Sequence, residues 1–145
     1  MSERRNFVQL RLKRQEAVLG QSGRVKISVI MSELALLRRV VPDKTMRSQI
    51  NELVSKLSGD LSWVDFRVTT LIDEPSAALG GPFYIIKFAE RQDQDVVYLE
   101  GREEPDYLES DEDVSRYESF FAALEKASLS RADSLDRLMA SVDTH

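Results

Sequence analysis

A helical stripe of apolar residues lies between two segments in which apolar and polar residues alternate. This pattern constrains the fold of the chain more than any other feature of its sequence. Apolar residues recur at intervals of three and four after Pro42, and Gly59 ends the run. These residues are Met46, Ile50, Leu53, Val54 and Leu57. The spacing places them on one face of a helix. Residues 25–31 and 63–71 flank that helix and alternate apolar with polar side chains, which predicts two strands. A strand, a helical crossover and a second strand favour parallel pairing.

Further elements are predicted from local signals on either side of this unit. Residues 4–19 have a helix-forming composition, and Ser32 is expected to cap a short helix that continues through Val40. Residues 83–89 and 96–100 are apolar runs joined by a polar connection, which indicates an antiparallel hairpin. We expect the acidic stretch after this hairpin to be a loop.

Two capping signals predict the C-terminal helices. Ser110 with Asp113 resembles a capping box, and Ser130 with Asp133 repeats it. Their apolar stripes are Val114, Tyr117, Phe121 and Leu124, then Leu135, Leu138, Met139 and Val142. The expected order is α-β-α-α-β-β-β-α-α. We therefore predict an α+β (mixed α/β) fold with a four-stranded mixed sheet, helices packed on that sheet, and a single regulatory or effector-like domain over residues 1–145.

The composition excludes several kinds of chemistry. The chain has no cysteine, and its one histidine is the last residue, His145. Disulfides, thiol catalysis and cysteine-rich metal centres are therefore excluded, and we expect no metal and no cofactor. No apolar run reaches the ~18 residues of a membrane helix, and no apolar region follows the N-terminus. The sequence thus predicts a cytoplasmic protein with no membrane partner.

Charge is distributed unevenly along the chain. The net charge is −5, yet residues 1–39 carry nine Lys/Arg against three Asp/Glu, or +6. Residues 90–118 carry twelve Asp/Glu against three Arg, or −9. This balance argues against direct DNA binding by the chain. It leaves open a basic N-terminal face, a head-to-tail contact, or a solvated surface of uneven charge.

One group of candidate binding residues is expected near the ends of the strands. Glu33, Arg38 and Arg39 flank the short helix after the first strand, and ligands favour crevices beyond the carboxyl ends of strands. Tyr98 and Glu100 of the hairpin would line the same crevice. The alternative is structural: an ion pair between Glu100 and an arginine beside the sheet.

Three further residues are candidates with a plainer alternative beside each. Gly80 and Gly81 would cradle a phosphate or, more simply, form the turn that leads into the hairpin. Trp63 would stack on a ligand or pack as a core or rim aromatic. The acidic residues 111–113 are explained by helix capping without catalysis. No G-x-S-x-G motif surrounds a serine, so we assign no catalytic residue, and an enzyme is the less favoured class.

Seven short stretches in a fixed order resemble one known family. They are RLKRQ (11–15), SELALLRR (32–39), QINEL (49–53), LGGPF (79–83), VYLE (97–100), VSRY (114–117) and ASLS (127–130). Over roughly residues 8–142 they resemble the C-terminal domain of actinobacterial Xre-type helix-turn-helix regulators of the Scr-type, antitoxin-like group. The resemblance implies a small cognate partner protein, often encoded alongside, a small-molecule effector as a further candidate, and DNA binding by a separate domain.

The chain departs from that family at two places. Such regulators carry a helix-turn-helix before this domain, whereas this chain begins at the domain's first helix. Residues 68–71 read VTTL where the family commonly has a VLPF-like sequence, and Ser76 stands where a histidine is frequent. We therefore expect a non-catalytic effector- or partner-binding domain of an Xre-family regulator. The alternatives are a stand-alone small-molecule-binding protein or an unrecognised enzyme, derived after loss of the helix-turn-helix, and a structural module forming a homodimer.

Overall fold

The fold was analysed in a computed structural model of the full chain. The structure describes residues 9, 12, 13, 15–19, 25–38, 40–73, 75, 80–89, 94–101 and 106–143. Residues 15–19 are helical, in agreement with the predicted N-terminal helix. Among the described helices, none combines the length and the apolar character needed to cross a bilayer.

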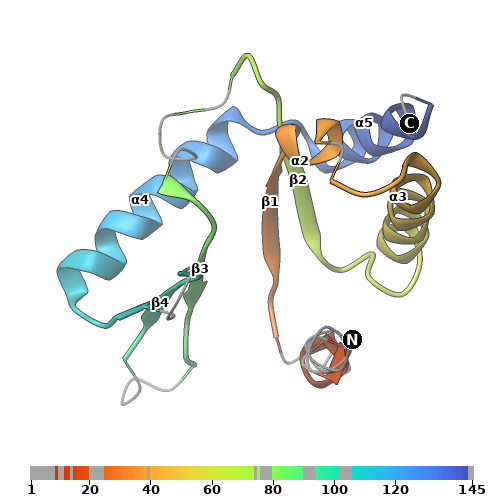
Figure 1. Ribbon diagram of the computed structural model, residues 1–145. Coiled ribbons are helices and arrows are strands. Elements are labelled where there is room, and N and C mark those ends of the chain that lie inside the picture. Colours follow the sequence, from red (N-terminus) through yellow and green to blue (C-terminus); the bar gives the residue numbers. More distant parts are fainter. Residues whose placement is uncertain are drawn as a thin grey trace. The chain divides into compact units, whose positions relative to one another are not determined.

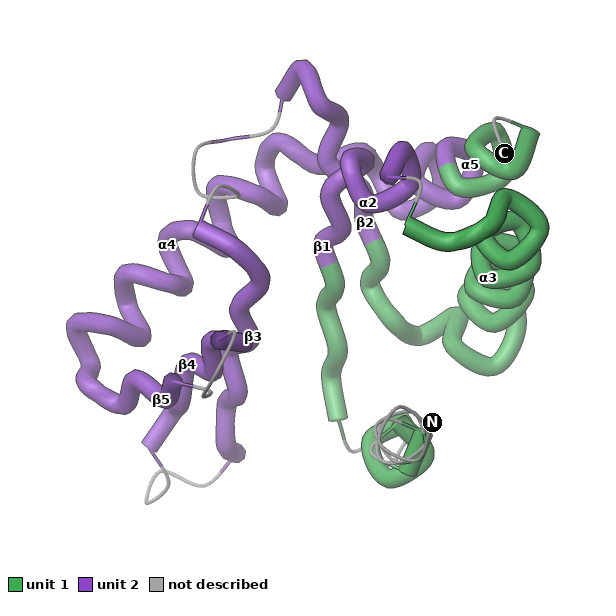
Figure 2. Tube along the Cα trace, viewed as in Figure 1, with its two compact units in different colours: residues 1–29, 39–66, 138–145 green, residues 30–38, 67–137 purple. Residues whose placement is uncertain are grey.

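The chain forms two compact units, and each is described by itself. Unit 1 contains residues 1–29, 39–66 and 138–145, and unit 2 contains residues 30–38 and 67–137 (Figure 2). The strands β1 (Ser28–Ser32) and β2 (Asp65–Thr69) and the helix α5 (Arg131–Val142) each continue from one unit into the other.

β1 and β2 form a two-stranded parallel sheet, which confirms the predicted strand–helix–strand unit (Figure 1). In unit 1 the Asp65 amide donates to the Ile27 carbonyl at 3.0 Å, and in unit 2 the Glu33 amide donates to the Thr69 carbonyl at 2.9 Å. Val64, Phe66 and Val68 are buried at alternate positions, as the pattern predicted.

The connection between these strands contains two helices. α3 (Asp43–Ser58) in unit 1 begins after Pro42 and ends at Gly59, as predicted, and buries Ile50 and Leu57 from the expected stripe. α2 (Leu34–Leu37) in unit 2 is shorter than predicted, because Arg38 already has an extended backbone with ψ 121°. The following Val40-Val41-Pro42 explains this early end, since β-branched residues and the residue before proline disfavour a helix.

A second sheet, entirely in unit 2, corrects the prediction of a single four-stranded sheet. β3 (Phe83–Ile86), β4 (Val96–Leu99) and β5 (Asp106–Leu108) pair antiparallel in that order. The hairpin of β3 and β4 was predicted, whereas β5 was expected to be loop.

The separation of the two sheets has a physical reason in the backbone pairing of β2. One edge of β2 faces β1, and the connection between the last two helices occupies the other. Thr69 forms a β-bridge with Ser128, and the Val68 carbonyl accepts from the Leu129 amide at 2.9 Å. The Val68 amide donates to the buried Ser134 hydroxyl at 2.9 Å. Both edges are therefore occupied at this point, and β3 cannot pair with β2.

The two C-terminal helices begin as the capping signals predicted. α4 (Asp111–Ala127) has Ser110 as its N-cap, whose hydroxyl accepts from the Asp113 amide at 3.1 Å. The Ser130 hydroxyl accepts from the Asp133 amide at 3.1 Å at the start of α5. α4 packs on β3 and β4, which confirms helix packing against a sheet for that helix.

The apolar stripes of these helices are buried to different degrees. Val114, Leu124 and Leu138 are buried. Tyr117, Phe121, Leu135 and Val142 are half-buried. Met139 was wrongly placed in a buried stripe, because 48% of its surface is exposed.

Candidate functional site

Three tyrosines lie side by side across the sheet of unit 2. Tyr84 on β3 is paired in register with Tyr98 on β4, and Tyr98 is paired with Tyr107 on β5. The ring centroids are 5.5 Å apart for the first pair and 5.2 Å apart for the second. Directly paired residues share a face of an antiparallel sheet. The Ile86–Val96 pair lies two positions along from the first tyrosine pair, on that same face. We call these five residues the tyrosine face.

The opposite face of this sheet is covered by α4. Val97 has no exposed surface, and the Phe83 ring contacts the Tyr117 ring of α4 edge-on at a centroid distance of 5.1 Å. On the tyrosine face, by contrast, 51% of Tyr84, 57% of Tyr107 and 44% of Ile86 are exposed. The sheet thus has one face that forms part of the core and one that presents aromatic rings to the surface.

Two acidic residues of the described strand ends border the tyrosine face. Asp106 is the one charged residue within the three strands, and Glu100 and Glu109 each follow a facing tyrosine by two positions. Both glutamates are exposed. Alternation along a strand directs residues two apart to the same side, so the two carboxylates border the tyrosine face.

The nearby lysine is engaged with α4. Lys87 follows β3 and forms an ion pair with Glu118. The hydrogen bond to Glu118 is the main cause that raises the pKa of the Lys87 ammonium above its ordinary value of 10.5. Desolvation opposes this, and the charges of Glu118 and Asp95 add to it.

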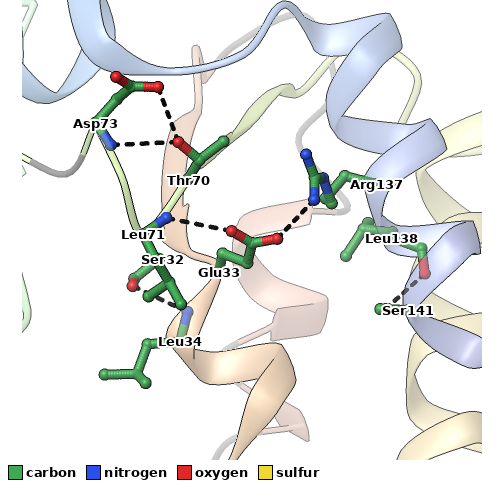
Figure 3. A network of polar contacts seen from close by, with 9 residues as sticks. All are labelled: Ser32, Glu33, Leu34, Thr70, Leu71, Asp73, Arg137, Leu138 and Ser141. Atoms are coloured by element: carbon green, nitrogen blue, oxygen red, sulfur yellow. Dashed lines mark hydrogen bonds and ion pairs between the residues drawn. The ribbon is translucent and has the colours of Figure 1, made fainter. Parts of the chain in front are cut away.

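A second polar cluster in unit 2 gathers at the carboxyl ends of the parallel strands (Figure 3). The Glu33 carboxylate, just beyond β1, accepts from the Leu71 amide at 3.2 Å through Oε2. Its Oε1 forms an ion pair with Arg137 Nη1 of α5 at 2.9 Å. The Glu33 side chain is 15% exposed and that of Arg137 is 45% exposed.

The turn that follows β2 has its own hydrogen bonds in the same cluster. The Thr70 hydroxyl donates to Asp73 Oδ2 at 3.0 Å, and the Asp73 amide donates back to that hydroxyl at 3.4 Å. Glu33 therefore connects this turn and α5 to the end of β1. The contacts of its carboxylate thus have a structural role.

The predicted site residues come from different parts of the fold. Glu33 directly follows β1, Tyr98 lies on β4 of the three-stranded sheet, and Trp63 is in unit 1. The Trp63 indole Nε1 is buried without a hydrogen-bond partner. Arg38 is exposed and donates its backbone amide to the Leu34 carbonyl at 3.1 Å. Arg39 lies outside the described residues.

The glycine pair lies just before β3. Gly81 has a φ of 89°, a conformation that favours glycine, and it precedes β3 by two residues. Gly80 and Gly81 are both exposed, with open space where a Cβ would be. This arrangement fits the simpler of the two interpretations, a turn into the hairpin.

The sequence analysis selected one of the three tyrosines and missed Tyr84, Tyr107 and Arg137. Tyr84 was detectable, because it shares the alternation of its strand with Ile86. In the described part of the chain, no group of three His, Cys, Asp or Glu side chains is placed to hold a metal ion.

Comparison with known proteins identifies a domain family for this chain. No curated protein and no solved structure matches the chain. A sequence model of one domain family matches residues 2–140, which is nearly the whole chain. The chain therefore belongs to the family described as "Domain of unknown function (DUF5753)".

Proposed function

We propose that this chain is a non-catalytic regulatory domain that binds a small partner protein through the tyrosine face. The observation that carries the proposal is the exposure of Tyr84 and Tyr107 beside Tyr98 on a sheet whose other face is already covered by α4. Tyrosine combines a large apolar ring with a polar hydroxyl, and it is enriched at the centres of protein interfaces.

The acidic side chains beside the helices support a structural role over a catalytic one. Asp113 completes the capping interaction of α4, and Asp133 does the same for α5. Both oxygens of Glu33 accept bonds from groups that hold the fold together. These contacts explain why carboxylates stand at these positions, without acid–base chemistry.

The place of the domain in a larger system rests on resemblance. The ordered stretches between residues 11 and 130 are similar to the C-terminal domain of Xre-type, antitoxin-like regulators. We propose that the chain acts as the partner-binding part of such a regulator in the cytoplasm, with DNA bound by a separate helix-turn-helix domain. Its partner is then the small protein encoded next to it.

Co-production with the protein encoded by the adjacent gene tests this proposal. Sedimentation of the purified mixture should give a complex for the wild type and a much weaker one for Tyr84→Ser combined with Tyr107→Ser. Ile72→Ser is the matched control, because Ile72 is 94% exposed in unit 2 outside the tyrosine face. A wild type that forms no complex refutes the proposal, as does a complex that the double variant leaves unchanged.

Small-molecule binding is a second candidate, favoured by one observation. Glu33 and the Thr70 hydroxyl lie together at the carboxyl ends of two parallel strands, where open sheets commonly bind ligands (Figure 3). Native mass spectrometry of the purified chain would detect a retained molecule. Loss of that molecule in Glu33→Gln would favour this candidate over partner binding.

A further inference from the structure

We infer that the tyrosine face binds a cationic partner segment whose arginine side chains stack on the tyrosine rings. The inference rests on the proposed function, since it specifies the chemistry of the partner at the same surface. It follows from the charge around this face and from the geometry of its rings.

The first argument is charge complementarity. The three strands contain no Lys or Arg, and Glu100 and Glu109 border the tyrosine face. In residues 94–101 and 106–109, which the structure describes and which contain β4 and β5, the charged residues are Asp95, Glu100, Asp106 and Glu109, and none is basic. Such a field attracts a cationic segment and disfavours an acidic one, because like charges brought together at an interface are costly. A phosphate backbone is disfavoured for the same reason.

The second argument is the arrangement of the aromatic rings. The rings of Tyr84 and Tyr98 are inclined by 49°, and those of Tyr98 and Tyr107 by 51°. Inclined neighbouring rings with exposed surface offer several ring faces along one line. A guanidinium within about 6 Å of a ring centroid is attracted by the ring's quadrupole. Arginine suits this better than lysine, because its planar group stacks and is more weakly hydrated.

The chain contains an example of the same contact within unit 2. The Arg116 guanidinium carbon lies 5.8 Å from the centroid of the Tyr117 ring on α4. Arg116 also forms an ion pair with Asp113. An arginine held by one tyrosine ring and one carboxylate is therefore already part of this structure. Tyr107 and Glu109 offer a partner's arginine the same two kinds of group.

Titration with defined peptides tests the inference. Three ten-residue peptides are used, alternating serine with arginine, with lysine or with glutamate. The readout is the NMR signal of the ¹³C-labelled tyrosine rings. The chain has four tyrosines, so Tyr117, which contacts Phe83 under the sheet, serves as an internal reference. The arginine peptide should shift Tyr84, Tyr98 and Tyr107 and leave Tyr117 nearly unchanged.

Variants separate the aromatic contribution from the charge contribution. Tyr107→Ser should weaken binding of the arginine peptide about two- to fivefold, the usual size of one exposed cation–π contact. Glu109→Gln should weaken it mainly at low salt. The matched controls are Ile72→Ser, which replaces another exposed large apolar side chain, and Glu52→Gln, which makes the same charge change; neither residue belongs to the tyrosine face, and both variants should bind as the wild type does.

The outcomes are decisive in both directions. Stronger binding of the arginine than of the lysine peptide, with weakening in Tyr107→Ser, supports the inference. Equal affinity for the two cationic peptides, preference for the glutamate peptide, or no shift of the three rings overturns it. These failures are distinct from failure of the proposed function. If the protein from the adjacent gene forms a complex that requires the tyrosines, but the peptides show no preference for arginine, the tyrosine face remains a partner-binding surface and only the inference of a cationic partner is refuted.

Discussion

The hydrogen bond between the Val68 amide and the Ser134 hydroxyl gives the sharpest prediction about stability. It joins residues 66 positions apart, its length is 2.9 Å, and it is buried within unit 2. Ser134 has no exposed surface, and neither has Val68. We expect Ser134→Ala to leave the Val68 amide without an acceptor in a place that water does not reach.

The magnitude follows from two opposing effects. A buried donor that loses its partner costs about 1–3 kcal/mol. Alanine is the better helix former, which recovers up to about 0.5 kcal/mol. Ser119→Ala is the matched control, because Ser119 is an exposed helical serine of α4 whose hydroxyl bonds the Ser115 carbonyl within the same helix. The free energy of unfolding should therefore differ by about 1–3 kcal/mol between the two variants.

Two assays measure this difference. In urea, with a slope of about 2 kcal/mol/M, a 2 kcal/mol loss lowers the midpoint by about 1 M. Hydrogen exchange adds a local measurement, since the Val68 amide should exchange roughly 10–100 times faster in Ser134→Ala. If Ser134→Ala is as stable as Ser119→Ala and the Val68 amide stays protected, the serine does not join α5 to β2 and the reasoning is refuted.

Three further predictions concern other contacts of unit 2. Glu33→Gln should lower the free energy of unfolding by about 1 kcal/mol, because it removes the negative charge of a group that accepts two hydrogen bonds. The control Glu52→Gln should lower it by less than about 0.5 kcal/mol, and equal losses of the two variants in chemical denaturation would contradict the prediction. Phe121→Ala should cost about 1–3 kcal/mol in the same assay, less than a fully buried phenylalanine, and a loss below about 1 kcal/mol would make α4 a detachable arm. Lys87→Gln should lose a small stabilisation that is present below pH 10.5 and disappears as pH rises through the raised pKa of Lys87; a difference from wild type that grows above that pH would contradict the pairing with Glu118.

The elements that the sequence predicts well are those with local signals. α3 begins after Pro42 and ends at Gly59, two residue types that commonly mark helix boundaries, and α4 begins after its N-cap Ser110, whose side chain accepts from the Asp113 amide. These signals depend on residues within a few positions. The parallel pair was also predictable, since a helical crossover between two alternating strands restricts how they can pair.

The elements that the sequence does not predict depend on distant pairing. β5 is three residues long, too short for alternation to be read, and its register with β4 creates the strand. The occupation of β2's second edge depends on Ser128 and Ser134, which give no local sign that they face a strand. The occupied edge of β2 explains why the hairpin does not extend the parallel pair through that strand, and pairing with β5 makes the hairpin a three-stranded sheet.

The candidate site residues likewise divide into those that local sequence identifies and those that depend on distant pairing. Tyr98 was selected as a candidate, yet the surface it belongs to requires Tyr107 on the strand that was missed. Glu33 was selected for a ligand crevice, and its observed partner Arg137 lies 104 residues away in the sequence. Residue type identified these positions, but only the three-dimensional pairing tells a surface feature from a structural contact.

The separation of the sheet's two faces also means that binding and folding can be tested independently. Val97 is completely buried under α4, whereas Tyr107 is 57% exposed on the other side of the same sheet. Threonine or a charged residue would serve a solvent-facing strand position without exposing a large ring. A row of three tyrosines is therefore not required by the fold, and its loss should change affinity far more than stability. Val97→Ala should have the opposite effect, because it removes buried volume and leaves the tyrosine face in place.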